Sequence, residues 1–89
     1  MIRKKVQIIN ALGLHARAAA KFVQLAGRYH SDIVVSRDGK TVNGKSIMGV
    51  MMLAANKQSW IELIINGQDE EVALENLESL ISNRFGESS

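Results

Sequence analysis

The sequence predicts an α+β fold in which helices cover one face of a four-stranded antiparallel or mixed sheet. Four segments have the alternation or the turn signals of strands, and three have the spacing of helices. Along the chain the two kinds follow the order βαββαβα. A doubly wound parallel sheet would need more strands, so a sheet with helices on one face fits this order best.

The first third of the chain predicts one strand and one helix. Residues 2–8 alternate apolar and polar side chains, with Lys4 as the exception, as in a half-buried strand. After a turn at residues 10–13 the spacing becomes helical from Ala16, and Gly27 is a typical helix end. The predicted inward face of this helix consists of Ala19, Phe22, Val23 and Ala26.

The middle of the chain predicts a β-hairpin and a short helix. Asp38 and Gly39 join predicted strands at residues 33–37 and 40–43, and an Asp-Gly pair is a strong hairpin signal. A short helix should then extend from residue 47 to about residue 54. Local sequence patterns alone therefore predict both the hairpin and the short helix.

The last third predicts the fourth strand and the third helix. Residues 60–65 alternate in the manner of a strand. A turn at residues 66–67 leads to a helix that begins near Asp69 and ends at Gly86, with Arg84 in its last turn. The predicted inward stripe of this helix consists of Val72, Ala73, Leu77, Leu80 and Ile81.

Composition limits the possible functions. The 89 residues are expected to form one domain (residues 1–89), and the absence of cysteine excludes disulfides and thiolate metal sites. Neither a secretory segment nor an apolar run of the roughly 18 residues that span a bilayer is visible. A cytoplasmic monomer without membrane insertion, metal or cofactor is therefore expected.

The charges are unevenly distributed along the chain. Residues 1–57 hold ten of the eleven basic residues and two acids, a net charge of +8, whereas residues 58–89 hold one arginine and seven acids, a net charge of −6. This asymmetry predicts a face that attracts anionic ligands or acidic proteins. The total of only +2 argues against a general nucleic-acid-binding protein.

His15 is the strongest candidate for a chemical role, although a lone histidine near a helix start is usually a surface or capping residue. It lies where the first strand has ended and a helix begins, and helix starts attract anions. The helix dipole disfavours an imidazolium, so the ring should be neutral and nucleophilic. Gly13 and Ala16 leave the position sterically open, and Arg17 can pair with a phosphate. The arrangement predicts acceptance of a phosphoryl group.

Residues 39–46 match the phosphate-loop pattern G-x-x-x-x-G-K-[ST]. The chain is, however, too short for the parallel βαβ core that carries such loops, and no later strand ends in an aspartate suited to magnesium. The hairpin at Asp38 and Gly39 would also make residues 40–43 a strand. A nucleotide-binding protein is therefore only a remote alternative.

Ser46 precedes an unusually apolar short helix. Its hydroxyl can cap that helix, and it is also a candidate for regulatory phosphorylation, which would change the charge of a docking surface. One helix of a small domain can bury only one apolar stripe. Some of the following residues are therefore expected to stay exposed and to contact partners: Ile47, Met48, Met51 and Met52.

Two motifs at matching spacing resemble the HPr family, the histidine-containing phosphocarriers of the bacterial phosphotransferase system. They are Gly13-Leu14-His15-Ala16-Arg17 and, thirty residues on, Gly44-Lys45-Ser46-Ile47-Met48-Gly49-Val50-Met51. The resemblance extends over essentially the whole chain. It implies an open-faced sandwich, in which three helices lie on one side of a four-stranded antiparallel sheet.

The resemblance also implies roles for individual residues. His15 would accept a phosphoryl group on Nδ1 from enzyme I, itself charged by phosphoenolpyruvate, and would pass it to enzyme IIA proteins. Arg17 and the backbone N–H of Ala16 would stabilise the phosphate. Ser46 matches the position that HPr kinase/phosphorylase modifies in many members. The contact surface for several partners would consist of Ile47, Met48 and Met51.

The chain departs from the family pattern at Ala18, where proline is usual. Alanine keeps a backbone N–H that proline lacks and is a good helix former, so a slightly less rigid but competent site is expected. A carrier of the nitrogen-related branch, with the same fold and histidine, is the alternative closest to this function. A regulatory binding module without phosphotransfer is another.

Overall fold

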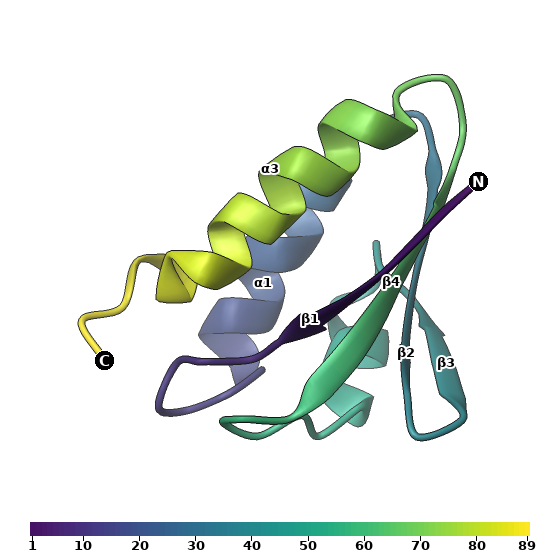
Figure 1. Cartoon of the computed structure of the whole chain (residues 1–89). Helices are drawn as coiled ribbons and strands as arrows, with labels where there is room; N and C mark the ends of the chain where they lie inside the picture. The colour runs from purple at the N-terminus through teal and green to yellow at the C-terminus, as the bar shows by residue number, and fades with distance from the viewer.

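The computed structural model describes all 89 residues, and its strands and helices follow the predicted order (Figure 1). The strands are β1 (Ile2–Gln7), β2 (Asp32–Arg37), β3 (Lys40–Asn43) and β4 (Trp60–Asn66). They pair antiparallel throughout, in the order β1-β4-β2-β3. The helices are α1 (Ala16–Ala26), α2 (Ile47–Met52) and α3 (Glu70–Ser82), and a short 3-10 helix, η1 (Arg84–Gly86), follows. The predicted fold class is confirmed, with an antiparallel rather than a mixed sheet.

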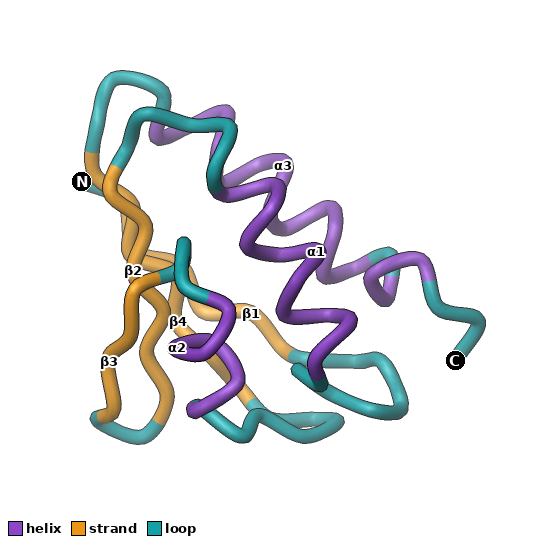
Figure 2. The backbone as a smooth tube through the Cα atoms, turned by 180° about the vertical axis from the view of Figure 1, so that it is seen from behind, coloured by secondary structure: helices purple, strands orange, loops and turns teal.

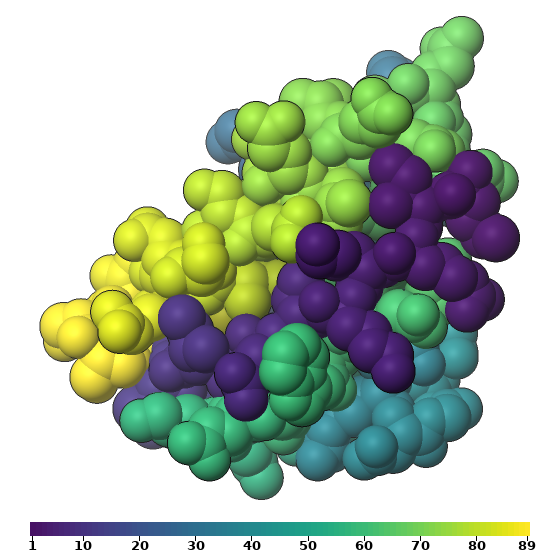
Figure 3. All heavy atoms as spheres, in the orientation of Figure 1, coloured from purple at the N-terminus to yellow at the C-terminus, as the bar shows by residue number.

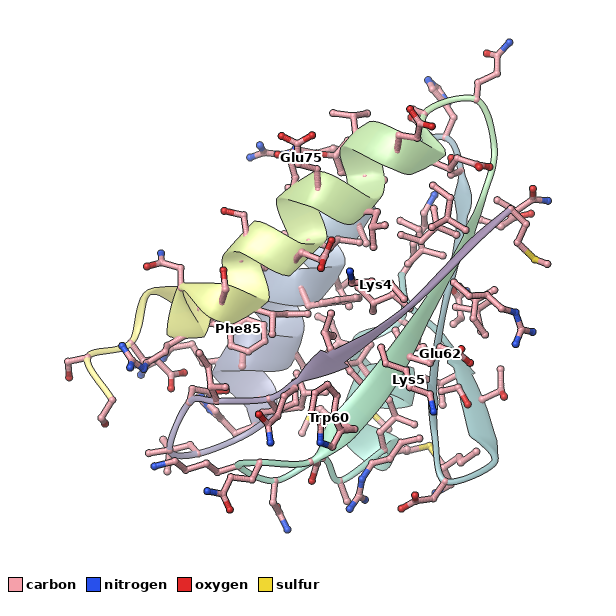
Figure 4. All side chains as sticks on the ribbon, viewed as in Figure 1. Lys4, Lys5, Trp60, Glu62, Glu75 and Phe85 are labelled. Carbon is pink, nitrogen blue, oxygen red and sulfur yellow. The ribbon has the colours of Figure 1, made fainter.

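The helices and the sheet form two layers. Helices α1 and α3 lie side by side over one face of the sheet, and the opposite face is uncovered (Figures 1 and 2). Alternate β4 residues are buried under the helices, while Trp60 and Glu62 occupy the other positions (Figure 4). Lys4, the exception in the β1 alternation, extends toward α3, where its Nζ lies 3.9 Å from Glu78. No helix has both the length and the apolar character needed to cross a bilayer.

The β2–β3 hairpin excludes the phosphate-loop alternative. Asp38 and Gly39 have φ of 49° and 82°, the left-handed angles that a type I′ hairpin turn requires at both central positions. Residues 40–43 are therefore a strand paired with β2 and cannot wrap around a phosphate. Lys45 is also engaged, since its Nζ donates to the carbonyl of Tyr29 (2.7 Å).

The prediction for the last helix was wrong in two respects. Helix α3 ends at Ser82, and Arg84 lies outside it because its backbone is left-handed (φ 56°). Val72 is exposed, since it lies about 100° around the helix from Ala73, on the side away from the core. The buried stripe consists of Ala73, Leu77 and Ile81, with Leu74 and Leu80 partly buried.

Candidate functional site

His15 immediately precedes α1 and supplies its first carbonyl. The N–H of Ala19 donates to His15 O (2.8 Å), so the N–H groups of residues 16–18 have no partner within the helix. These groups carry the partial positive charge of a helix start. The structure thus places His15, Ala16 and Arg17 at an anion-attracting helix end, as the sequence predicted.

Gly13 fixes the loop that carries His15. Its φ is +66°, and a Cβ at this position would lie 2.4 Å from Ala55 O, so only glycine fits. The close approach allows the N–H of Leu14 to donate to Ala55 O (2.9 Å), and the Leu14 side chain is buried. The loop is therefore held against the segment that follows α2.

The C-terminal tail, residues 84–89, covers one edge of the His15 ring. Nε2 of His15 lies 2.5 Å from Oε2 of Glu87, and 27% of the His15 side chain is exposed. Figure 3 shows the last residues, in yellow, against the purple segment that follows β1. The expectation of a sterically open position is therefore wrong for the Nε2 edge. Nδ1 forms no hydrogen bond within the protein.

Asn10 holds the other oxygen of Glu87. The buried Asn10 amide donates through Nδ2 to Gly13 O (2.8 Å) and to Glu87 Oε1 (3.1 Å). The hydrogen bond from His15, followed by that from Asn10, holds the pKa of the Glu87 carboxyl below its usual value despite partial burial. The sequence predicted Asn10 only as a turn residue, and no local pattern connects it to a residue 77 positions away.

His15, Arg17 and Glu87 line one hollow of about 460 Å³ at the start of α1. Arg17 is exposed and takes part in none of the ion pairs. Its guanidinium is therefore free to pair with an anion bound in the hollow. No cluster of three or more His, Asp or Glu side chains that could hold a metal ion occurs in the structure.

Ser46 caps α2, and the helix exposes most of its apolar residues. The N–H of Gly49 donates to Ser46 Oγ (3.1 Å), which confirms the predicted cap. The helix ends at Met52, earlier than expected, and Ala54 has a left-handed backbone (φ 50°). Val50 is buried, whereas 73% of Met48 is exposed. The exposed apolar surface of α2, which packs against α1, consists of Ile47, Met48, Met51 and Met52.

Comparison with known proteins identifies the family. The family model described as "PTS HPr component phosphorylation site" matches residues 2–83. The chain belongs to the HPr family. The phosphocarrier protein HPr of Cupriavidus necator is 54% identical to it over 87 residues, 98% of each chain. HPr-C-His from Thermoanaerobacter tengcongensis superposes with a TM-score of 0.96 at 45% identity, over 100% of both chains.

These HPr relatives also define the general activity. They are named phosphocarrier proteins, so this HPr is a phosphocarrier of the phosphotransferase system and not an enzyme. A second T. tengcongensis structure, described as an HPr dimer, is 46% identical and has a TM-score of 0.79, covering 98% of this chain and 100% of that one. The resemblance carried by the two motifs is thereby confirmed.

Proposed function

We propose that this HPr accepts a phosphoryl group from enzyme I on Nδ1 of His15 and donates it to enzyme IIA proteins. One observation supports the proposal: three kinds of group meet at the start of α1. They are the Nδ1 atom of His15, which forms no hydrogen bond, the backbone N–H groups without a helical partner, and the Arg17 guanidinium without an ion pair. A nucleophile and two kinds of anion-stabilising group therefore meet at one point.

The chemistry needs little else from the protein. The Nδ1 lone pair attacks phosphorus while the N–P bond of the donor phosphohistidine breaks, and that electron pair returns to the donor ring. The N–H of Ala16 and the guanidinium of Arg17 stabilise the charge on the phosphoryl oxygens. These groups are few and open to solvent, which suits a carrier that must also release its phosphoryl group.

The exposed α2 surface is the proposed docking site for both enzyme I and enzyme IIA. Its residues Ile47, Met48 and Met51 offer an adaptable apolar contact beside α1, the helix that His15 precedes. The excess of basic residues in positions 1–57 favours acidic partners around such a contact. The protein would act in the cytoplasm as a monomer, with residues 1–89 as one unit.

Incubation with phosphoenolpyruvate, magnesium and enzyme I tests the transfer. The protein should gain one phosphate that acid removes and base preserves, because the phosphate is attached to an imidazole nitrogen. Intact-mass spectrometry before and after acid treatment measures both properties. A protein that gains no phosphate, or only an acid-stable one, would contradict the proposal.

We propose in addition that HPr kinase/phosphorylase phosphorylates Ser46 to regulate docking. Ser46 is partly exposed and borders the α2 surface. A phosphate at this position would not unfold the helix, since negative charge is favourable at a helix start. It would, however, place a negative charge beside the apolar contact and repel acidic partners.

Two substitutions of Ser46 separate the effect of its helix cap from the effect of an added negative charge. S46A should lower the free energy of unfolding by about 1 kcal/mol because the cap is lost, whereas S46D should leave it nearly unchanged because aspartate caps equally well. Only S46D should weaken binding to enzyme I, by roughly fivefold, which corresponds to about 1 kcal/mol. Urea denaturation and titration calorimetry measure the two effects. Equal weakening by both variants would show that loss of the serine hydroxyl, and not the added charge, weakens binding to enzyme I.

A further inference from the structure

The C-terminal tail reaches His15 through backbone conformations that its residue types disfavour. Arg84 and Phe85 both have left-handed backbones (φ 56° and 54°), which are unfavourable for residues with side chains. The buried Phe85 ring (Figure 4) anchors the tail, and Lys21 Nζ donates to Phe85 O (2.6 Å). Tertiary contacts therefore outweigh the backbone strain and hold Glu87 at the imidazole.

Both oxygens of the Glu87 carboxylate are engaged in this position. Oε2 lies 2.5 Å from His15 Nε2, and Oε1 accepts from Asn10 Nδ2 (3.1 Å). Only 16% of the Glu87 side chain is exposed, so these bonds compensate for lost hydration. Because a carboxylate can only accept hydrogen bonds, Nε2 must carry the proton in this contact.

We propose that Glu87 is a positioning residue that keeps the proton of His15 on Nε2 and thereby makes Nδ1 the phosphoryl acceptor. The inference rests on the proposed role of His15 as acceptor. A neutral imidazole carries one proton, so a proton fixed on Nε2 leaves the lone pair on Nδ1. Asn10 orients the carboxylate in turn, as a third group orients the base in other nucleophilic sites.

The contact between Glu87 and His15 assists both the phosphorylation of His15 and its discharge to enzyme IIA. When Nδ1 attacks phosphorus, the N–P bond forms and the ring becomes a phosphoimidazolium, whose positive charge faces the Glu87 carboxylate. When the acceptor histidine of enzyme IIA attacks, the N–P bond breaks, its electron pair returns to Nδ1 and His15 leaves as neutral imidazole. Nε2 keeps its proton throughout. Loss of that proton would make the leaving group an imidazolate anion and slow the discharge.

Single-turnover transfer by four proteins tests this role: wild type, E87A, E87Q and the control E75A, which replaces an exposed glutamate on α3. Removing one charge-assisted hydrogen bond should slow transfer in E87A by roughly tenfold to a hundredfold. E87Q retains an acceptor oxygen without the charge and should fall between E87A and wild type. The Glu75 side chain is exposed on α3, outside the hollow, and takes part in no ion pair, so E75A should match wild type.

Two further measurements separate positioning from a merely structural role of the tail. Discharge to enzyme IIA should begin to slow at a lower pH in E87A than in wild type, because the phosphorylated ring then lacks the carboxylate that holds its Nε2 proton. In NMR spectra, the Nε2 proton of His15 should exchange slowly with solvent in wild type and E75A, and its signal should disappear in E87A.

These experiments test the positioning role of Glu87 separately from the acceptor role of His15. A wild-type protein that gains no phosphate from enzyme I contradicts the acceptor role, and the NMR comparison then still decides whether Glu87 holds the Nε2 proton. Equal rates, pH profiles and spectra for E87A and wild type would overturn the positioning role, as would slower transfer with an unshifted pH profile. Faster transfer in both E87A and E87Q would make Glu87 an inhibitory contact and overturn it as well.

Discussion

Replacing His15 by alanine should abolish acid-labile phosphorylation by enzyme I, whereas replacing His30 should leave it unchanged. These are the two histidines of the chain. His15 lies at the start of α1 beside Arg17, while His30 lies beyond its other end, about 16 Å away along an 11-residue helix. The backbone N–H of His30 donates to Asp69 Oδ2 (2.8 Å), so the neighbouring charge repels a phosphate.

Intact-mass measurement of H15A and H30A after the same incubation checks this contrast. Thermal unfolding of both variants shows whether each is folded under the assay conditions. Acid-labile phosphate on H15A would remove His15 from the acceptor role. Loss of the phosphate in folded H30A would show that the second histidine takes part in the transfer.

Most of the fold could be predicted because its signals act over a few residues. The Asp38-Gly39 pair identifies its hairpin without any tertiary information, since the left-handed angles of the turn select these residue types. Ser46 identifies the start of α2 in the same way, through a hydrogen bond to a residue three positions on. The position of His15 follows from the strand and helix on either side of it.

The covering of His15 could not be predicted, because every contact that creates it is distant in sequence. Glu87 is 72 residues from His15, and a helical pattern continued through Arg84 would direct the chain elsewhere. The chain turns back because burial of the Phe85 ring favours a left-handed backbone, a tertiary effect without a local signature. The error at Val72 has a similar origin, since packing determines the width of the buried stripe.

Replacing Phe85 by alanine should lower the free energy of unfolding by about 3–5 kcal/mol. The ring is fully buried, and η1 packs against both α1 and α3. Domains of this kind have about 5–15 kcal/mol of total stability, so the loss would be a large fraction of it. Urea denaturation should show a lower midpoint with an unchanged slope. A loss below about 1 kcal/mol would show that the ring is not part of the core.

Replacing Phe85 by glycine provides the matched control for the backbone. Glycine adopts a φ of 54° without strain, whereas alanine retains a cost of roughly 1–2 kcal/mol. F85G should therefore be at least as stable as F85A, the reverse of the usual order for these two residues. A clearly less stable F85G would mean that the left-handed turn is not maintained once the ring is absent.

Because Phe85 anchors the tail, F85A should also slow phosphoryl transfer at temperatures at which it remains folded. E87A should slow transfer as well, but with a much smaller change in stability, since it removes a partly exposed contact rather than a buried ring. If Phe85 acts on the site only through Glu87, the double variant E87A/F85A should transfer no more slowly than E87A alone. Additive losses would mean that the anchor influences His15 by a second route, through α1 itself.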